Sequence, residues 1–552
     1  MVMKYQGQTF MTDNDLKVNM LGFWPRLEIQ NPALQEQVGE FLGGDEVVAY
    51  AQHLVSSGMD FAAVEAQILE DIQNPKKGEL KDIVFNKTVT GIGRGHSLGG
   101  LSGVVLGLNG TKMLDSGLTG FVASRSLATS SRRRETTTGE IVVPESLKGR
   151  EDLLNEYLEI SRDVFKVSAQ FKERFGKLGG VQTFNKVIPY NNPADIFMVM
   201  PLDTMATLAF EVKQDAINPK GNFIPRELVQ LAEMAPEIME KARLDTMYNQ
   251  RVKVPRDTYL HYTVFKDPSS PNYALELAEE KNMHQNPLVD GFSKDFTDGF
   301  YEVLARLEND FKATREITDP NELAERSMEN MLAIRSFAGE YNEAVGFKIV
   351  DSLSWRVWSE QKRHATLRQN VESVYGAAER AGEIVKGLWP QVQRANDTGE
   401  IDKGLYEKLE SAIIIDPKLK ENPELGIPYI YHSVKQLMFH QKLLEEGIEP
   451  RDALYIVPKN IRVRTLENYD LVNLVDLELP LRLCKTCEPE RYATSWKKRD
   501  MIAEILPELD FLLQPKCNIG FCTEDPYCHH IGDLRDGYDR DLHKQTKQAM
   551  LS

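Results

Sequence analysis

The stretch WRVWSEQKRHATLRQNVESVY, residues 355–375, places a dense polar group after a run with helical apolar spacing. Arg363 and His364 suit an anionic ligand, because a guanidinium donates two parallel hydrogen bonds to a phosphate and a histidine changes its charge near pH 7. Ser373 precedes the next helical run, where a hydroxyl and backbone N–H groups face an anion. The pattern predicts a nucleotide-binding loop. The alternative is a solvated helix terminus at which Ser373 is an ordinary N-cap.

The spacing resembles the signature of the flavin-dependent thymidylate synthases, which reads Arg-His-Arg, seven residues, Ser. Arg363 and His364 match its first two positions and Ser373 its last, whereas Ala365 departs from its third. Val371 departs as well, since the family usually has a glutamate there beside the substrate. The resemblance implies a catalytic site at Arg363, His364 and Ser373. It also implies flavin contact by Asn370 and substrate contact by Arg368, Gln369, Glu372, Ser373 and Tyr375.

The first part of the chain resembles the same family at two places. Gly95-His96-Ser97 resembles an early region of the family that helps to hold flavin, and Ala123-Ser124-Arg125 resembles the signature loop, with Arg125 at its third position. Three arginines follow at 132–134, as phosphate contacts or as a solvated charge run. A histidine beside glycines could instead cap a turn. The flavin ligands that the resemblance implies are His96, Ser97, Arg125, Arg363, His364 and Asn370.

A short frame occurs twice in the sequence and indicates an internal repeat. Residues 193–201, PADIFMVMP, and residues 450–458, PRDALYIVP, share a proline, one residue, an aspartate, an apolar strand-like run and a second proline. The alternative is a chance similarity of two apolar runs flanked by prolines. The stretch KDPSSPN, residues 266–272, suits a linker or exposed turn between two copies. We therefore expect a first repeat at 1–268 and a second at 269–552.

Helix-like periodicity dominates, and the fold class that we expect is α+β, with two tandem copies of one module, each helix-rich with a small mixed sheet. The predicted helices cover residues 151–175, 224–247, 301–316, 322–344, 371–393 and 433–446. The predicted strands are short and cover residues 141–143, 195–200, 258–265 and 453–457.

All five cysteines lie in a C-terminal tail at about 484–530, which calls for a local cause. An odd number of clustered cysteines fits a metal site better than a disulfide framework in a reducing compartment. Tetrahedral zinc is the first choice and an iron–sulfur cluster the second. The alternative is reduced, partly buried cysteines. The candidate ligands are Cys484, Cys487, Cys517, Cys522, Cys528 and His529.

Length and charge narrow the class of protein further. A chain of 552 residues exceeds what one hydrophobic core usually organises. With 83 acidic and 66 basic residues, the net charge of −17 repels polyanions and disfavours nucleic acid as a partner. No run of about 18 apolar residues is present, and the N-terminus lacks the pattern of a signal peptide. We expect a cytoplasmic protein with a small-molecule nucleotide partner and no membrane partner.

The resemblance implies reductive methylation of deoxyuridylate to thymidylate, with methylenetetrahydrofolate as carbon donor, NADPH as reductant and FAD as hydride carrier. In the family an arginine after the strand contacts the nucleotide, and our alignment places Asp215 and Asn473 there. The alternatives are methylation of another pyrimidine nucleotide and a non-catalytic flavin- or nucleotide-binding scaffold. Because the family's sites lie between subunits of a tetramer, a duplicated chain implies a homodimer.

Overall fold

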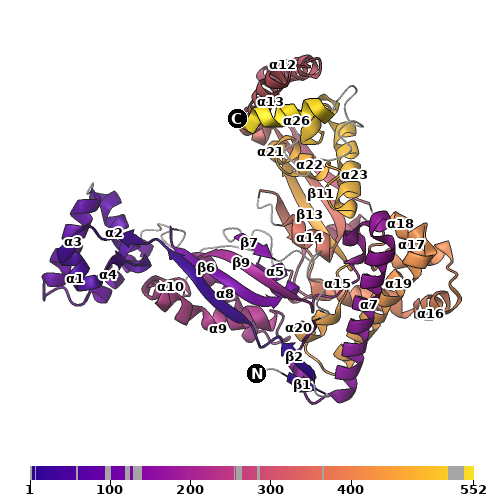
Figure 1. The fold of residues 1–552 in the computed structure, drawn as a ribbon, viewed down its shortest axis with the longest axis horizontal. Coiled ribbons are helices and arrows are strands. Elements are labelled where there is room, and N and C mark those ends of the chain that lie inside the picture. The colour runs from indigo at the N-terminus through magenta and orange to yellow at the C-terminus, as the bar shows by residue number, and fades with distance from the viewer. Residues whose placement is uncertain are drawn as a thin grey trace.

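Two four-stranded sheets organise the protein, each with its own group of helices (Figure 1). The computed structural model describes residues 3–5, 8–57, 60–93, 101–118, 125–128, 140–253, 255, 264–281, 286–362, 366–519 and 540–551. The strand order is β3-β6-β9-β7 in the first sheet and β10-β11-β13-β12 in the second. In chain order, both sheets therefore read first, second, fourth, third.

The strands of the two sheets pair in the same way. The first sheet comprises β3 (Lys17–Trp24), β6 (Gly103–Thr111), β7 (Arg125–Ala128) and β9 (Pro193–Pro201). The second comprises β10 (Leu288–Lys294), β11 (Val345–Ser354), β12 (Arg368–Val371) and β13 (Arg462–Asp470). Every neighbouring pair in these two sheets is antiparallel. A smaller sheet of three strands near the N-terminus is mixed, because Met3–Tyr5 pairs antiparallel with Gln8–Thr12, and Gln8–Thr12 pairs parallel with Val142–Val143.

Matching irregularities show which positions of the two sheets correspond. The pairing shifts between Met20 and Gly22 in β3 and between Val289 and Gly291 in β10, and each glycine precedes a phenylalanine. These bulges occupy the same place, and bulges are specific features rather than defects. The strands β6 and β11 lead directly into helices of equal length, α5 (Lys112–Leu118) and α14 (Trp355–Gln361).

Corresponding residues of the two sheets differ in residue number by one of two constant values, which we call offsets. In β6, α5 and β7 the offset is 243, which matches Thr111 with Ser354. In β3, β9 and the segment before β9 the offset is 269, which matches Pro193 with Arg462. We call residues matched in this way equivalent.

Helices at equivalent places in the chain differ in length and number. Between the first two strands stand α1 (Pro32–Val38), α2 (Gly44–Ser57), α3 (Phe61–Gln73) and α4 (Leu80–Gly93) in one case, and α12 (Asp298–Arg315) and α13 (Pro320–Glu340) in the other. Each of these two groups of helices contributes to a separate apolar cluster. Figure 1 shows α1–α4 at the left and α12 and α13 at the top, far apart.

The central core joins the two predicted repeats. It contains buried side chains from Leu16 to Val463, so it extends across the boundary expected at residue 268. Its long helices are α7 (Glu151–Phe184) and α19 (Pro423–Glu445), which pack against each other. Between β12 and α19 lie α15 (Val374–Lys386), α16 (Trp389–Thr398), α17 (Lys403–Leu409) and α18 (Pro417–Lys420).

Helices also follow the last strand of each sheet. They are α8 (Leu202–Ala216), α9 (Arg226–Lys241) and α10 (Asp245–Arg251) after β9, and α21 (Leu471–Val475), α22 (Glu478–Arg482) and α23 (Pro489–Ile505) after β13. The remaining elements include β1 (Met3–Tyr5), β2 (Gln8–Thr12), β8 (Val142–Val143), α11 (Tyr273–Glu280), α24 (Lys516–Ile519) and α26 (Arg540–Leu551).

One predicted strand is wrong, and with it the proline frame that indicated the repeat. Residues 453–456 lie in α20 (Pro450–Ala453) and a 3-10 turn (Leu454–Ile456), which Val457 follows, so the counterpart of β9 is β13 instead. The run is buried on all sides, and a short continuous apolar run does not distinguish a buried strand from a buried helix. Pro450 at the first helical turn is a helix-start signal that the strand prediction overlooked.

The other predicted elements fare better, except that the helix predicted at 371–393 begins at the end of β12 and is divided into α15 and α16. The prediction for 195–200 lies within β9, and those for 151–175 and 433–446 lie within α7 and, but for its last residue, α19. The helix predicted at 224–247 is divided into α9 and α10 at Arg243, whose φ is 55°. The strand predicted at 258–265 lies mostly outside the described residues. Among the described residues, no helix has both the length and the apolar run that crossing a membrane requires.

Candidate functional site

Equivalent residues of the two halves, by which we mean the chain before and after residue 268, meet each other at the centre of the protein. The hydroxyls of Ser116 and Ser359, equivalent by 243, form a hydrogen bond of 2.9 Å. Pro189 and Pro458, equivalent by 269, form an antiparallel bridge. In a twofold interface only positions near the axis pair with their own counterparts. The two sheets with their helices are therefore arranged about an approximate twofold axis that passes between these pairs.

A buried glutamate holds the start of α5 and another holds the start of α14. Glu227 accepts hydrogen bonds from the backbone N–H (2.8 Å) and hydroxyl of Thr111. Glu490 accepts the same two bonds from Ser354, at 2.6 Å and 2.8 Å. Thr111 and Ser354 are equivalent, so the same arrangement is built twice.

The third partner of each glutamate comes from the opposite half. Tyr455 donates its hydroxyl to Glu227 at 3.0 Å, while Lys186 lies 2.5 Å from Glu490. Tyr455 and Lys186 are equivalent by 269. Burial raises the pKa of Glu227 to about 7. Burial acts in the same direction on Glu490, but Lys186 and Ser354 outweigh it and lower the pKa of that carboxyl.

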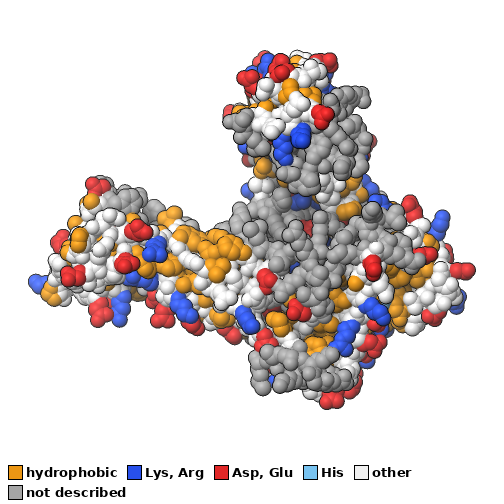
Figure 2. All heavy atoms as spheres, in the orientation of Figure 1, with side chains coloured by type: hydrophobic (Ala, Val, Ile, Leu, Met, Phe, Trp, Pro, Cys, Tyr) orange, Lys and Arg blue, Asp and Glu red, His pale blue; other side chains and the backbone are white. Residues whose placement is uncertain are grey.

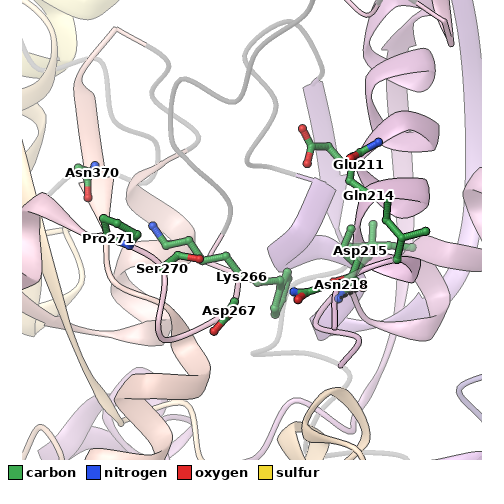
Figure 3. Close-up of a pocket in the computed structure, with 13 residues that line it drawn as sticks. Glu211, Gln214, Asp215, Asn218, Lys266, Asp267, Ser270, Pro271 and Asn370 are labelled. Atoms are coloured by element: carbon green, nitrogen blue, oxygen red, sulfur yellow. Dashed lines mark hydrogen bonds between the residues drawn. The ribbon is translucent and has the colours of Figure 1, made fainter. Parts of the chain in front are cut away.

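A cavity of about 680 Å³ lies between the two halves, away from these glutamates. Glu211, Gln214 and Asp215 of α8 and Asn218, just after it, line one side, and Lys266, Ser270, Pro271 and Asn370 are among the other lining residues (Figure 3). Four apolar side chains also line it, namely Ile217, Ile224, Leu228 and Phe265. A cavity of this size with an apolar lining and a few convergent polar groups is typical of a small-molecule site.

Asn370 connects this cavity with the stretch that resembles the family signature. It lies in β12, opposite Leu466, and its side chain lines the cavity. Its Oδ1 is buried and accepts no hydrogen bond from the described residues. A buried acceptor without a partner is costly unless a ligand or water satisfies it.

The end of the same stretch is attached to the first half. Ser373 is the N-cap of α15, but its hydroxyl donates to the carbonyl of Lys266 at 2.5 Å and not to its own helix. The backbone N–H of Val374 donates to the carbonyl of Val264 at 2.9 Å. Tyr375 donates its hydroxyl to the carbonyl of Phe223 and packs edge-on against that ring. Ser373 and Tyr375 therefore position the cavity wall in this structure.

Glu372, which was also predicted to contact substrate, has its partners within the protein. Arg380 holds the carboxylate of Glu372 through two bonds of 2.6 Å and 2.7 Å, and the backbone N–H of Arg464 donates to it. Gln369 is buried in β12, whereas the side chain of Arg368 is exposed. Neither of these two lines the cavity.

Two parts of the sequence alignment are wrong. Arg125 of β7 pairs with Val199 of β9, and Arg368 of β12 pairs with Asn468 of β13 at the equivalent position. The counterpart of Arg125 is therefore Arg368 and not Ala365. The structure also separates the two positions at which the family has an arginine. Asp215 lies near the end of α8, whereas Asn473 lies in α21 and is equivalent to Thr204. The second error follows from the proline frame, which matched β9 with residues 450–458 instead of β13.

Asp215 has a structural role beside the cavity. Its carboxylate accepts hydrogen bonds from the backbone N–H groups of Phe223 and Ile224, at 2.9 Å to 3.0 Å, which fixes the turn from α8 to α9. Burial raises the pKa of this carboxyl, against the effect of those hydrogen bonds.

Several predicted ligands lie outside the described residues. These are His96, Ser97, Arg363, His364, Cys522, Cys528 and His529. Of Arg125 the structure describes the backbone, in β7.

The three described cysteines carry free thiols. Cys484 forms a 3.1 Å contact with the hydroxyl of Thr486, and burial raises the pKa of Cys487. Among the residues that the structure describes, no group of three or more His, Cys, Asp or Glu side chains is placed to hold a metal ion. The zinc site remains a prediction, since half of its candidate ligands lie in the undescribed range 520–539.

Sequence reasoning missed the residues that α8 and the segment before α11 contribute to the cavity. Lys266 lies in the stretch interpreted as a linker, and Gln214 and Asn218 lie at the end of a helix with no motif. Their polar type was visible in the sequence, but their convergence depends on how the two halves pack.

Comparison with known proteins points to one family over part of the chain. No family model matches the chain. Flavin-dependent thymidylate synthases of Pyrococcus abyssi, Pyrococcus horikoshii and Thermococcus kodakarensis are 27%, 28% and 29% identical to it over 123 residues. The match covers 21% of this chain and 50% of each relative, so the chain spans about half the length of the curated relatives that it matches. This partial homology indicates a relationship to the flavin-dependent thymidylate synthases.

Proposed function

We propose that the chain consists of two tandem copies of a module related to the flavin-dependent thymidylate synthases, at 1–268 and 269–552, folded as a pseudo-dimer. The common strand order, the matching bulges and the contacts on the approximate axis support this. A further pair of hydrogen bonds agrees with it. Asn191 donates to Ser161 of α7 at 2.9 Å, and its equivalent Asn460 donates to Ser433 of α19 at 2.7 Å.

The cavity between α8 and β12 is, in this proposal, where flavin and a pyrimidine nucleotide meet. The observation that carries it is the position of Asn370, which belongs to the signature-like stretch of one copy and lines the cavity together with α8 of the other. Its buried Oδ1, which accepts no bond from the described residues, fits a ligand that offers an N–H donor. Flavins and pyrimidines both offer such donors on a planar ring.

The proposed reaction is the FAD-dependent reductive methylation of deoxyuridylate, with methylenetetrahydrofolate and NADPH as co-substrates. Bound flavin supplies the hydride chemistry, and the protein supplies binding, orientation and electrostatics. The amides of Gln214, Asn218 and Asn370 match the alternating donors and acceptors at the edge of a planar ring. Arg363 and His364 would hold anionic groups and stabilise negative charge on the activated base. His96, Ser97 and Arg125 are the proposed flavin contacts from the first copy.

The direct test is an assay for thymidylate with deoxyuridylate, methylenetetrahydrofolate, NADPH and FAD. We expect product from the native protein and a loss of about 100-fold or more in kcat/KM in Arg363→Ala, because an electrostatic contact to the reacting group is removed. The matched control is Arg394→Ala, which removes an exposed arginine of α16. Product formation that is unaffected in Arg363→Ala would remove this residue from the site.

A second candidate is a non-catalytic scaffold that keeps flavin or nucleotide binding, and the departures at Ala365 and Val371 favour it. If the purified protein is yellow and binds FAD and deoxyuridylate but forms no thymidylate, the scaffold function is supported. If it methylates a different pyrimidine nucleotide, a third function is supported, that of an enzyme with another substrate.

We also propose that two chains associate as a homodimer, equivalent to the family's tetramer, and that the cysteine-rich tail binds zinc. Light scattering should give twice the chain mass of 62.7 kDa. Elemental analysis should give one zinc per chain, lost in a Cys484→Ser, Cys487→Ser double variant. A monomeric mass or metal-free native protein would overturn the respective proposal.

A further inference from the structure

The charged groups around the cavity are unevenly distributed. Glu211 and Asp215 place two carboxyl groups on the α8 side. Asp267, on the opposite segment, forms an ion pair of 3.5 Å with Lys220. Among the described residues that line the cavity, Lys266 supplies the one cation, and Figure 3 shows it between the α8 side chains and Asn370.

The backbone on both sides of Lys266 is held in place. Its own carbonyl accepts the hydroxyl of Ser373, and the carbonyl of Val264 accepts the N–H of Val374. The ring of Phe265 lies 6.2 Å from that of Trp355, in the core. A lysine with a flexible stem is thus anchored at a defined position on the cavity wall, beside the signature-like stretch.

Lys266 is cationic at neutral pH. Burial lowers its pKa to about 8, and the charge of Glu372 acts in the opposite direction. Glu372 is itself engaged by Arg380 at 2.6 Å. The other charged groups that line the same cavity are the carboxyls of Glu211 and Asp215 on α8 and of Asp267 on its own segment.

We propose that Lys266 binds the phosphate of the nucleotide and so fixes its direction in the cavity, with the phosphate at Lys266 and the base against Gln214 and Asn218. This inference rests on the proposed function of the cavity. A phosphate on the α8 side would face two carboxyl groups, and like charges repel strongly in a partly buried site. At Lys266 it meets an ammonium, which donates charge-assisted hydrogen bonds to phosphate, while the amides of Gln214 and Asn218 suit an uncharged ring.

The test compares two ligands that differ by the phosphate alone, deoxyuridylate and deoxyuridine, by calorimetric titration at low salt. We expect Lys266→Met to weaken deoxyuridylate binding by about 10- to 100-fold, as loss of a charge-assisted hydrogen bond requires, and to change deoxyuridine binding by less than about twofold. Lys266→Arg should retain deoxyuridylate affinity within a few-fold, and the exposed control Lys403→Met should match the native protein.

The outcomes separate this inference from the proposed function. A native protein that binds neither ligand overturns the function of the cavity and the role of Lys266 together. A native protein that binds deoxyuridylate, with Lys266→Met binding it equally well or losing both ligands equally, overturns the role of Lys266 alone. The equal loss would indicate a structural role, which Lys266→Arg and the melting temperature of each variant check.

A pH titration gives an independent readout. Deoxyuridylate affinity of the native protein should fall as the pH rises through about 8, because Lys266 then loses its charge. Lys266→Arg should show no such fall, since a guanidinium stays protonated there. The carboxyls of Glu211, Asp215 and Asp267 are common to both proteins. A parallel fall in both would contradict the assignment.

Discussion

Glu227 and Glu490 occupy the same place in the two halves, but their pKa values are shifted in opposite directions. Each accepts the N–H and hydroxyl of the residue that begins a helix near the approximate axis. The opposite half adds Tyr455 to the first and Lys186 to the second. The pKa is raised to about 7 in Glu227 and lowered in Glu490. The local arrangement is therefore shared, and the equivalent residue from the other half decides the charge.

The comparison agrees with the proposed tandem duplication. In a homodimer a substitution at an axis contact occurs in both subunits, whereas tandem copies can differ at one site alone. The proposed ligand cavity agrees with this, because it joins α8 of one copy to the signature-like stretch of the other.

The outward faces of the two sheets differ as well. Helix α11 covers the second sheet and buries Leu466 and Val350. At the equivalent of Leu466 the first sheet has Phe197, which is 46% exposed, beside Leu21, which is 58% exposed. Figure 2 shows hydrophobic side chains gathered over this region of the molecule.

The largest expected effect lies at the charged member of the axis pair. Lys186→Met should destabilise the protein by about 3–5 kcal/mol, because it leaves the buried carboxylates of Glu488 and Glu490 without their cation. Tyr455→Phe, its equivalent, removes one hydrogen bond and should cost about 1–2 kcal/mol. Urea denaturation measures both. Equal losses of stability in the two variants would mean that the charge of Lys186 does not contribute to stability beyond one hydrogen bond.

The two outward faces provide the next comparison. Leu466→Ala should cost about 3 kcal/mol, since it opens a cavity under α11. Phe197→Ala should change the free energy of unfolding by less than about 0.5 kcal/mol in the monomer, because the ring is half exposed. A large loss at Phe197 would show that its face is covered in solution.

The opposite pKa shifts predict opposite pH dependence. Folded Glu227 keeps its proton up to about pH 7, while the unfolded carboxyl loses it near 4.5, so its contribution to stability falls as the pH rises through this window. Glu490 has a lowered pKa, so its contribution falls as the pH decreases through the acid range.

Glu227→Gln should therefore flatten the decline in stability between pH 4.5 and 7, an effect on the order of 2 kcal/mol. Glu490→Gln, the matched variant, should flatten the loss at lower pH. Unfolding free energies measured from pH 4 to 8 decide this, and an unchanged slope in Glu227→Gln would show that another group titrates there.

The smallest effects test the similarity of the halves. Asn191→Ala and Asn460→Ala should each cost about 1–2 kcal/mol, because each leaves a buried serine hydroxyl without its donor. The two values should agree within about 0.5 kcal/mol. A clear difference would show that the two helices carry unequal roles despite their common geometry.

The sequence predicted the α+β class, the central strand β9 and the long helices, because periodicity over many residues reflects one buried face. It predicted a repeat from the wrong frame, since a buried helical turn at 453–457 has the same apolar run as a strand. The true correspondence rests on paired registers and on contacts such as that between Ser116 and Ser359, which single-chain patterns do not contain.

The candidate site was predictable in part. Asn370 was found through the signature-like stretch, whereas Lys266, Gln214 and Asn218 converge on it through packing between distant segments. Ser373 and Tyr375 were expected to contact substrate, and in this structure their hydroxyls donate to the carbonyls of Lys266 and Phe223.

The measurement that tests the central claim most directly is the number of flavins bound per chain in the presence of deoxyuridylate. Protein reconstituted with FAD, dialysed and quantified by absorbance should contain one flavin per chain, because the site related to the proposed one by the approximate axis has Leu127 in place of Asn370. Two flavins per chain would contradict the account, since the second site would then bind flavin without this asparagine.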